Sequence, residues 1–200
     1  ERSRKGLFLA MQYPSEIAGV TNADFIKSAM QSRLAEGERI SLFKFIKSLD
    51  KAVQELKMRD DLPHRYVNEG FSGGEKKRNE ILQMKMLKPK FAILDEIDSG
   101  LDVDALKIVG ENVNMMKSPD FGALIITHYE RLLDYLGVDK VHVLINGKIV
   151  ADGGLELIEK IDQQGYDWIK EELGIEDETR VNPSILGSCA VKKVTGDNNE

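Results

Sequence analysis

The 200-residue sequence has little cysteine and no long apolar run, and each absence excludes a class of protein. Its single cysteine, Cys189, excludes an intramolecular disulfide framework and fits a reducing, cytoplasmic compartment or an equivalent organelle compartment. No apolar run approaches the roughly 20 residues that span a bilayer, so we expect no direct membrane insertion. The net charge of −6 is mild and indicates no basic surface for nucleic acid.

The composition, 42% hydrophobic and 31% charged, predicts a folded globular unit. The chain opens with Glu1-Arg-Ser-Arg-Lys-Gly6, without a methionine or a targeting pattern, so we expect the natural N-terminus to lie upstream. The polar stretch 174–200 has no periodicity and is predicted to be a flexible tail, in which Cys189 is an exposed free thiol.

Hydrophobic patterning predicts a strand followed by a helical segment in the first third of the chain. Residues 6–12 indicate a buried strand that leaves a sheet at Gln12, followed by a loop through Gly19. A helical pattern starts at Asn22, and residues 20–70 are predicted to be a helical subdomain. Its second helix is predicted to bury one face, made of Leu42, Phe45, Ile46, Leu49, Val53 and Leu56.

Strands and helices then alternate, which indicates an α/β fold with a mostly parallel sheet and crossover helices. A helix opens at Ser72 and ends at Pro89, a buried strand covers 91–94, and Asp102 caps the next helix. A second buried strand covers 123–126.

The last third of the predicted core is a hairpin followed by helices. Asn146-Gly147 is the favoured dipeptide of a type I′ hairpin turn, so an antiparallel pair is predicted at the end of the sheet. One or two amphipathic helices carrying Trp168 follow over 154–173.

Two adjacent acids, Asp95 and Glu96, follow the apolar strand 91–94. Ligands of parallel sheets bind outside the carboxyl ends of the strands, where such acids are held rigidly. Asp95 can hold Mg²⁺, and Glu96 can orient and deprotonate an attacking water. The competing interpretation is that both acids merely begin a loop.

Ser72-Gly-Gly-Glu75 marks a helix start with two interpretations. Ser72 and Glu75 alone form a capping box, which is a structural device. Capping does not require Gly73 and Gly74, which bare backbone amides at the positive end of the helix dipole and suit a phosphate group.

Two further polar residues follow predicted strands. His128 comes after the strand 123–126, where it can hydrogen-bond a terminal phosphate or the attacking water, although a lone histidine is more often structural. Gln12 also stands at a strand exit, where its amide oxygen can coordinate a metal or position water.

In chain order, these pieces resemble the motifs of the ABC ATPases. Gln12 matches the Q-loop, Phe71-Ser-Gly-Gly-Glu75 the signature motif, Phe91-Ala-Ile-Leu-Asp-Glu96 the Walker B motif, Ser99-Gly-Leu-Asp102 the D-loop and His128 the H-loop. The resemblance covers residues 1–150. It implies a P-loop ATPase core made of residues 1–19 and 71–173, with the helical subdomain 20–70 inserted and an N-terminal part missing.

Within this family the chain is most similar to the SufC proteins, judged by Gln12-Tyr-Pro-Ser-Glu-Ile-Ala-Gly-Val20, Gly73-Gly-Glu-Lys-Lys-Arg-Asn79 and the segments 98–106, 127–135 and 165–168. Glu75 stands where transporter ATPases usually carry glutamine. Ile97 departs mildly from the expected small polar residue. The serious departure is that no Gly-x-x-x-x-Gly-Lys-Ser/Thr loop occurs anywhere in the sequence.

The resemblance implies an ATP hydrolase that uses ATP and Mg²⁺ and forms an ATP-dependent homodimer. Ser72, Gly73, Gly74 and Glu75 of one copy would meet the nucleotide held by the other, with Asp102 crossing the interface, while Glu96 and His128 catalyse. SufB and SufD are the implied partners, in iron–sulfur cluster assembly. Without its phosphate loop, the 200-residue chain alone is expected to be inactive.

Two alternatives stay open. The chain could belong to the ATP-binding subunit of an ABC membrane transporter, although the segment after Gln12 argues against it. It could also be a non-catalytic module that docks partners through its helical subdomain. The upstream coding sequence discriminates these, because a phosphate loop before Glu1 indicates an enzyme.

Overall fold

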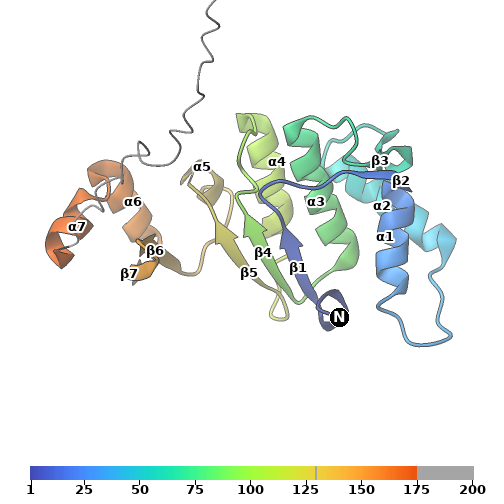
Figure 1. Ribbon diagram of the computed structural model, residues 1–200, viewed down its shortest axis with the longest axis horizontal. Helices are drawn as coiled ribbons and strands as arrows, with labels where there is room; N and C mark the ends of the chain where they lie inside the picture. The colour runs from blue at the N-terminus through green and yellow to red at the C-terminus, as the bar shows by residue number, and fades with distance from the viewer. Residues whose placement is uncertain (129, 175–200) are drawn as a thin grey trace, which may run out of the picture.

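The structure, a computed structural model, describes residues 1–128 and 130–174, so the predicted flexible tail and Cys189 lie outside the described residues apart from Gly174. A three-stranded parallel sheet forms its centre, with β4 (Phe91–Asp95) between β1 (Leu7–Ala10) and β5 (Gly122–Ile126) (Figure 1). A short 3-10 helix, η1 (Ser3–Lys5), precedes β1. The parallel sheet is confirmed, although its first strand ends at Ala10 and leaves Gln12 just beyond it.

Two helices cross over between the strands, α3 (Gly73–Leu87) and α4 (Val103–Asn114). Both start at the residues predicted from the sequence. Ser72 forms a complete capping box with Glu75, and the side chain of Asp102 accepts a hydrogen bond from the backbone amide of Ala105. The helix α3 ends with Lys88 in the left-handed conformation, just before Pro89.

Only one face of the sheet is covered by these helices. Ala92 and Leu94 point into the core with α3 and α4 and are fully buried. The opposite face carries side chains that are 43 to 51% exposed, namely Leu9, Phe91, Leu124 and Ile126. The predicted burial of these strands is therefore wrong for this second face, which no described residue covers.

The segment between β1 and α3 contains α1 (Asn22–Gln31), α2 (Leu42–Glu55) and a single 3-10 turn, η2 (Leu62–His64). Both α1 and α2 pack against α3. The predicted loop through Gly19 is wrong, because β2 (Ile17–Thr21) forms an antiparallel pair with the two-residue strand β3 (Tyr66–Val67). Thr21 then caps α1 through the amide of Asp24.

The buried face of α2 is narrower than predicted. Phe45, Leu49 and Val53 are at most 4% exposed, whereas Leu42 and Ile46 are 55% and 47% exposed. Ile46 lies about 100° around the helix from Phe45, so it falls at the edge of the buried stripe. Leu42 is the first residue of the helix.

The predicted hairpin is present as β6 (Val141–Ile145) and β7 (Lys148–Gly153). Asn146 and Gly147 both have positive φ, 49° and 74°, as a type I′ turn requires. Its predicted place at the end of the main sheet is wrong, because within the described chain it is a separate two-stranded sheet.

Three helices lie in the last part of the described chain: α5 (Glu130–Leu133), which packs against α4, and α6 (Leu155–Gln164) and α7 (Asp167–Leu173), which contact the hairpin. In α6, Lys160 lies 3.4 Å from the ring centroid of Trp168, which α7 carries. No helix within residues 1–128 and 130–174 has the length and apolar character needed to cross a membrane.

Candidate functional site

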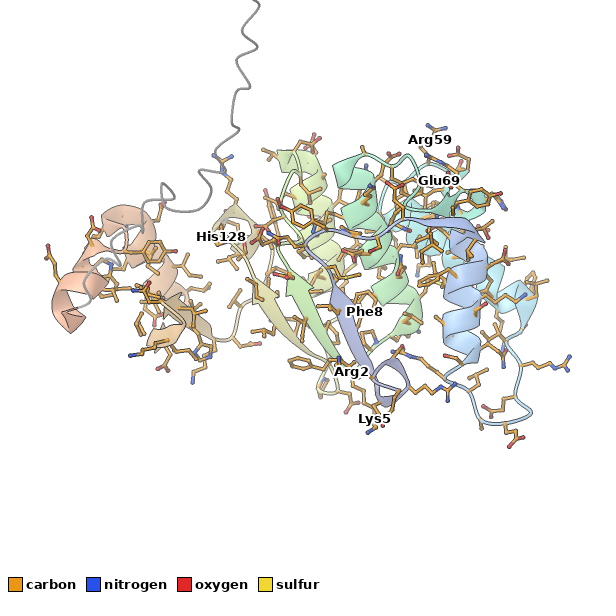
Figure 2. The ribbon with its side chains drawn as sticks, in the orientation of Figure 1. Arg2, Lys5, Phe8, Arg59, Glu69 and His128 are labelled. Carbon is orange, nitrogen blue, oxygen red and sulfur yellow. The ribbon has the colours of Figure 1, made fainter. Side chains whose placement is uncertain are left out.

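The carboxylate of Glu96 lies between Gln12 and His128. The Nε2 atom of Gln12 donates a hydrogen bond to Oε2 of Glu96 at 2.6 Å, and Nε2 of His128 lies 3.1 Å from Oε1. The three residues follow β1, β4 and β5, whose carboxyl ends meet at one edge of the sheet (Figure 1), and Figure 2 shows His128 at this edge. The fold therefore brings together three residues that are far apart in the sequence.

Glu96 has an unusual backbone conformation. Its φ is 47°, in the left-handed region that a non-glycine residue seldom adopts, and its amide donates to the carbonyl oxygen of Ile126 at 2.9 Å. Such strain persists when surrounding structure fixes it, and it concentrates at functional sites. The bond to β5 helps to hold the Glu96 side chain on the His128 side of the sheet edge. The Glu96 side chain is 21% exposed and that of His128 is 73% exposed, so both are accessible to a ligand.

Asp95 and Gln12 provide oxygen donors at the same edge. Asp95 is the last residue of β4 and is partly buried. Mg²⁺ is usually held by one or two protein carboxylates together with substrate phosphates and water. Residues 1–128 and 130–174 contain no cluster of three or more acidic, histidine or cysteine side chains that could hold a metal alone. Asp95 and the amide oxygen of Gln12 are thus candidate metal ligands that do not form a complete set by themselves.

Asp98 supports this edge and was not singled out as a site residue from the sequence. It is 4% exposed, and one carboxylate oxygen accepts a hydrogen bond from the hydroxyl of Thr127. This bond ties the turn after Glu96 to the residue before His128. A charged residue in a predicted turn gives no sequence signal that it will be buried.

Two charged side chains of α3 bind the backbone at Gln12, and sequence reasoning missed both. Nζ of Lys77 donates to the carbonyl oxygens of Met11 at 2.9 Å and Gln12 at 2.8 Å. The amide of Met11 donates to Oε1 of Glu80 at 2.9 Å. Lys77 is 4% exposed and Glu80 is 5% exposed. The helix that starts at Ser72 therefore fixes the position of Gln12.

Burial shifts the pKa of both groups toward their neutral forms. Desolvation lowers the pKa of Lys77, opposed by the charges of Glu80, Asp95, Asp98 and Glu96. Desolvation raises the pKa of Glu80 to about 7, opposed by the hydrogen bond from Met11 and by the charge of Lys77. The protonation of Glu80 therefore changes near neutral pH.

The helix start at Ser72 forms a second group of predicted residues. The amide of Ser72 donates to Oε2 of Glu75 at 2.9 Å, and the amide of Glu75 donates to Oγ of Ser72 at 3.2 Å. A Cβ atom at Gly73 would meet nothing within 4 Å, and one at Gly74 would only make ordinary contact with Leu101. Packing thus does not require these glycines, and they leave the amides accessible.

The structure keeps the two groups apart. Among the described residues, no hydrogen bond or ion pair joins Ser72 or Glu75 to Glu96 or His128. Asp102 belongs to neither group, because its carboxylate accepts from the amide of Ala105 at 2.7 Å and caps α4. One chain therefore presents a polar sheet edge and a separate helix start with accessible amides.

The fold, an α/β core with a helical segment before α3, is that of solved ATP-binding cassettes. Solved cassettes share it: one described as a dimeric bacterial ABC transporter cassette matches with a TM-score of 0.65 at 14% identity, covering 76% of this chain and 64% of that one. Another, described as the ATP-binding subunit of an ABC transporter, matches with a TM-score of 0.64 at 22% identity, covering 86% and 69%.

Sequence comparison gives the family. The family described as ABC transporter matches residues 2–99. A Bacillus subtilis (strain 168) protein named vegetative protein 296 is 62% identical over 179 residues, covering 90% of this chain and 69% of the relative. A probable ABC transporter ATP-binding protein of Streptococcus pyogenes serotype M3 is 57% identical, covering 88% and 69%. A probable ATP-dependent transporter of Cyanophora paradoxa is 50% identical, covering 86% and 67%. The chain belongs to the ABC transporter ATP-binding protein family and spans about two thirds of the length of these relatives.

Proposed function

We propose that this chain is the larger part of a SufC-type ABC ATPase, which couples ATP-driven dimerisation and hydrolysis to iron–sulfur cluster assembly. The observation that carries the hydrolytic role is the placement of Glu96 between Gln12 at 2.6 Å and His128 at 3.1 Å. A carboxylate held by two polar side chains at the carboxyl edge of a parallel sheet suits a general base beside a bound nucleotide.

In this proposal each residue at the sheet edge has its own task. Glu96 orients and deprotonates the attacking water, and His128 hydrogen-bonds the terminal phosphate or that water. Asp95 and the amide oxygen of Gln12 hold Mg²⁺, which supplies charge stabilisation for the phosphates when bound. Because Lys77 and Glu80 fix the backbone at Gln12, the position of that residue depends on α3.

The helix start acts on a second copy of the chain. Ser72, Gly73, Gly74 and Glu75 approach the γ-phosphate of a nucleotide held by the other copy, and Asp102 lies at that interface. Within the described part of the chain no hydrogen bond or ion pair joins Ser72 to Glu96, which supports this division. Residues 1–19 and 71–173 form the ATPase core, 20–70 the helical subdomain and 174–200 the tail, in the cytoplasm or an equivalent organelle compartment.

The test of hydrolysis uses the extended protein, meaning this chain preceded by an upstream segment that carries a phosphate-binding loop. Glu96→Gln should abolish steady-state ATP hydrolysis and leave ATP binding intact, because the amide keeps the shape of the side chain but accepts no proton. Unchanged hydrolysis would remove Glu96 from this role. An upstream coding sequence without a phosphate loop would instead favour a non-catalytic binding module.

The SufC assignment rests on the segment after Gln12, on Glu75 and on the segment 98–106, and it names SufB and SufD as partners. The names of the Streptococcus relatives favour a second candidate, the ATP-binding subunit of an ABC membrane transporter. Co-purification separates the two. The extended protein should bind purified SufB and SufD from the same source, and association with a membrane permease instead would support the transporter.

A further inference from the structure

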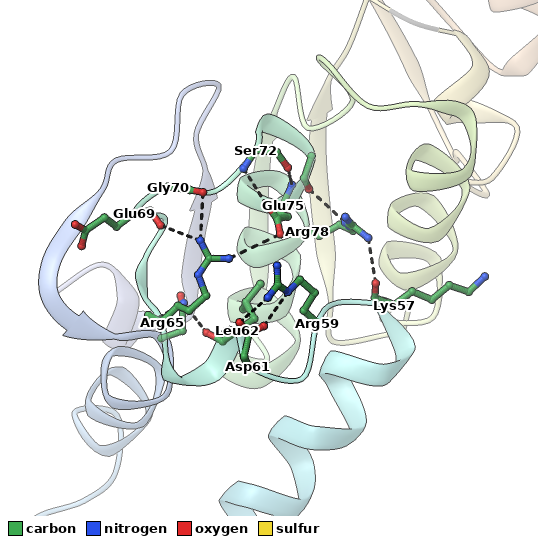
Figure 3. Close-up of polar contacts among 12 residues, drawn as sticks. Lys57, Arg59, Asp61, Leu62, Arg65, Glu69, Gly70, Ser72, Glu75 and Arg78 are labelled. Carbon is green, nitrogen blue, oxygen red and sulfur yellow. Dashed lines mark hydrogen bonds and ion pairs between the residues drawn. The ribbon is translucent and has the colours of Figure 1, made fainter.

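Arg65 contacts the loop that leads into α3 at successive residues (Figure 3). Its Nη2 atom donates to the carbonyl oxygens of Glu69 at 3.3 Å and Gly70 at 3.2 Å. Its guanidinium carbon lies 4.4 Å from the ring centroid of Phe71, and its Nη1 atom lies 3.9 Å from Oε1 of Glu75. A single side chain thus contacts both the loop and the carboxylate of the helix start.

The backbone of Arg65 is itself held firmly. Its carbonyl oxygen accepts hydrogen bonds from the amide and from Nδ2 of Asn22, both at 3.0 Å. Asn22 is fully buried, and its Oδ1 accepts from Nδ2 of Asn79 on α3 at 2.8 Å. The guanidinium therefore extends from a backbone that is tied to the same helix whose start it contacts.

Glu75 places a negative charge at the helix start, beside the guanidinium of Arg65. The amide of Ser72 holds one carboxylate oxygen of Glu75, and this bond is the largest cause of the lowered pKa of Glu75, followed by Ser72's hydroxyl and the charges of Arg65 and Arg59. Glu75 is thus ionised at neutral pH. A carboxylate in the first turn suits the helix dipole, but it repels a phosphate that approaches the same amides.

The other nearby cations are already engaged. Arg59 makes a forked pair with Asp61, at 3.0 and 2.9 Å, and Lys76 pairs with Glu16 at 2.7 Å. Arg78 donates to the carbonyl oxygens of Lys57 at 3.2 Å and Gly74 at 3.4 Å. Among the described residues, Arg65 is the cation that forms an ion pair with Glu75. The side chains of Arg65 and Glu75 are 29% and 21% exposed, so their interaction is only partly screened by water.

We propose that Arg65 is a positioning residue whose positive charge offsets that of Glu75, so that the helix start at Ser72 accepts the terminal phosphate of a nucleotide held by a second copy. This inference rests on the proposed function and deepens it, because it assigns the electrostatic balance of the trans contact to a residue outside the signature motif.

The test compares variants of the extended protein in the Glu96→Gln background, by sedimentation velocity over a series of ATP concentrations. Arg65→Met should raise the ATP concentration for half-maximal dimerisation about tenfold, because Glu75 then repels the phosphate uncompensated. Glu75→Gln is the matched change, since glutamine keeps the capping box and removes the charge. The double variant Arg65→Met with Glu75→Gln should return to within about threefold of the parent.

Arg65→Lys separates charge from shape. It keeps the positive charge and loses the planar guanidinium whose Nη2 atom contacts Glu69 and Gly70, so it should dimerise like the parent. If circular dichroism shows that Arg65→Met is unfolded, the comparison of Arg65→Lys with the parent tests the inference instead.

Four results would overturn the inference. Equal dimerisation of Arg65→Met and the parent would remove Arg65 from this role. Impaired Arg65→Met without rescue by Glu75→Gln, or impaired Arg65→Lys, would assign Arg65 to bracing the loop alone. Failure of the Glu96→Gln parent to dimerise with ATP would instead refute the proposed trans contact itself and this inference with it.

Discussion

Lys77 of α3 donates a hydrogen bond from its ammonium group to the backbone carbonyl oxygen of Gln12 at 2.8 Å. Glu80, one turn further along α3, accepts from the amide of the neighbouring Met11. Two buried charges thus hold the segment that presents Gln12 to Glu96. The signature helix α3 is therefore hydrogen-bonded to the segment that forms the hydrolytic edge of the same chain. In the proposed dimer, however, the start of α3 and this edge act on different nucleotides.

Removing the side chain of Lys77 should destabilise the folded protein. We expect Lys77→Met to lower the free energy of unfolding of the extended protein by about 3 kcal/mol, because it leaves the carbonyl oxygens of Met11 and Gln12 without their donor and removes the charge that opposes the desolvation of Glu80. Urea denaturation measures this loss. Lys77→Met combined with Glu80→Gln should recover part of it, since the second change removes the isolated charge and keeps an acceptor for Met11. A double variant less stable than the single variant would contradict this account.

Glu80 should make stability depend on pH. Its pKa is about 7 in the folded protein, above the ordinary value of 4.5, so the folded state binds the proton more tightly. The favourable contribution is complete below pH 4.5 and is lost as pH rises through 7, with a total of up to about 3 kcal/mol. The free energy of unfolding should therefore fall over this window relative to Glu80→Gln.

The Glu80→Gln variant provides the comparison in urea titrations at pH 5, 6, 7 and 8. Oε2 of Glu80 has no hydrogen-bond partner within the described part of the chain, so a glutamine amide there carries a fixed cost. That cost shifts the difference equally at every pH. The slope of the difference is thus the relevant quantity, and a difference that is constant from pH 5 to 8 would rule out titration of Glu80.

Much of the fold could be predicted because its signals are local. The capping box of Ser72 and Glu75, the cap at Asp102 and the Asn146-Gly147 turn each depend on residues within one turn of structure. The strand β4 was predicted because an apolar run ending in two acids has few other interpretations. The strand β2 was missed because its partner β3 is two residues long and lies far away in the sequence.

The candidate site was predictable only in its outline. Gln12, Glu96 and His128 were chosen because each follows a predicted strand, and the fold places them together. Lys77, Glu80 and Arg65 were missed because charged residues on a helix or in a loop usually face water. The burial of Lys77 and Glu80 and the contacts of the partly exposed Arg65 depend on packing of α3 against the segment before it, which no local pattern encodes.

The isolated 200-residue chain should bind ATP only weakly. The sequence contains no Gly-x-x-x-x-Gly-Lys-Ser/Thr loop, and such a loop supplies the lysine and the nested amides that hold the β- and γ-phosphates. Calorimetric titration with Mg-ATP measures the affinity, with the extended protein as the control. Low-micromolar binding by the isolated chain would show that other residues hold the nucleotide.

Ser72→Arg should prevent ATP-dependent dimerisation of the extended protein in the Glu96→Gln background. A bulky side chain at the helix start occupies the space that the phosphate would take, and its cation opposes the positive end of the helix dipole. The affinity of the monomer for ATP should barely change, because the phosphate loop supplies it. Sedimentation with and without ATP measures dimerisation, and calorimetry measures the affinity of the monomer.

Ser72→Ala is the control that separates the effect of the added cation on dimerisation from the effect of losing the helix cap. Both substitutions remove the hydroxyl that accepts from Glu75, which costs about 1 kcal/mol of stability. Only the arginine adds charge and bulk, so Ser72→Ala should retain more dimer than Ser72→Arg at the same ATP concentration.

Mixing Ser72→Arg with a subunit disabled in its phosphate loop leaves one composite site with both halves intact, and this mixture should recover some dimer. If Ser72→Arg alone dimerises as well as the parent, the helix start at Ser72 does not act on the nucleotide of a second copy.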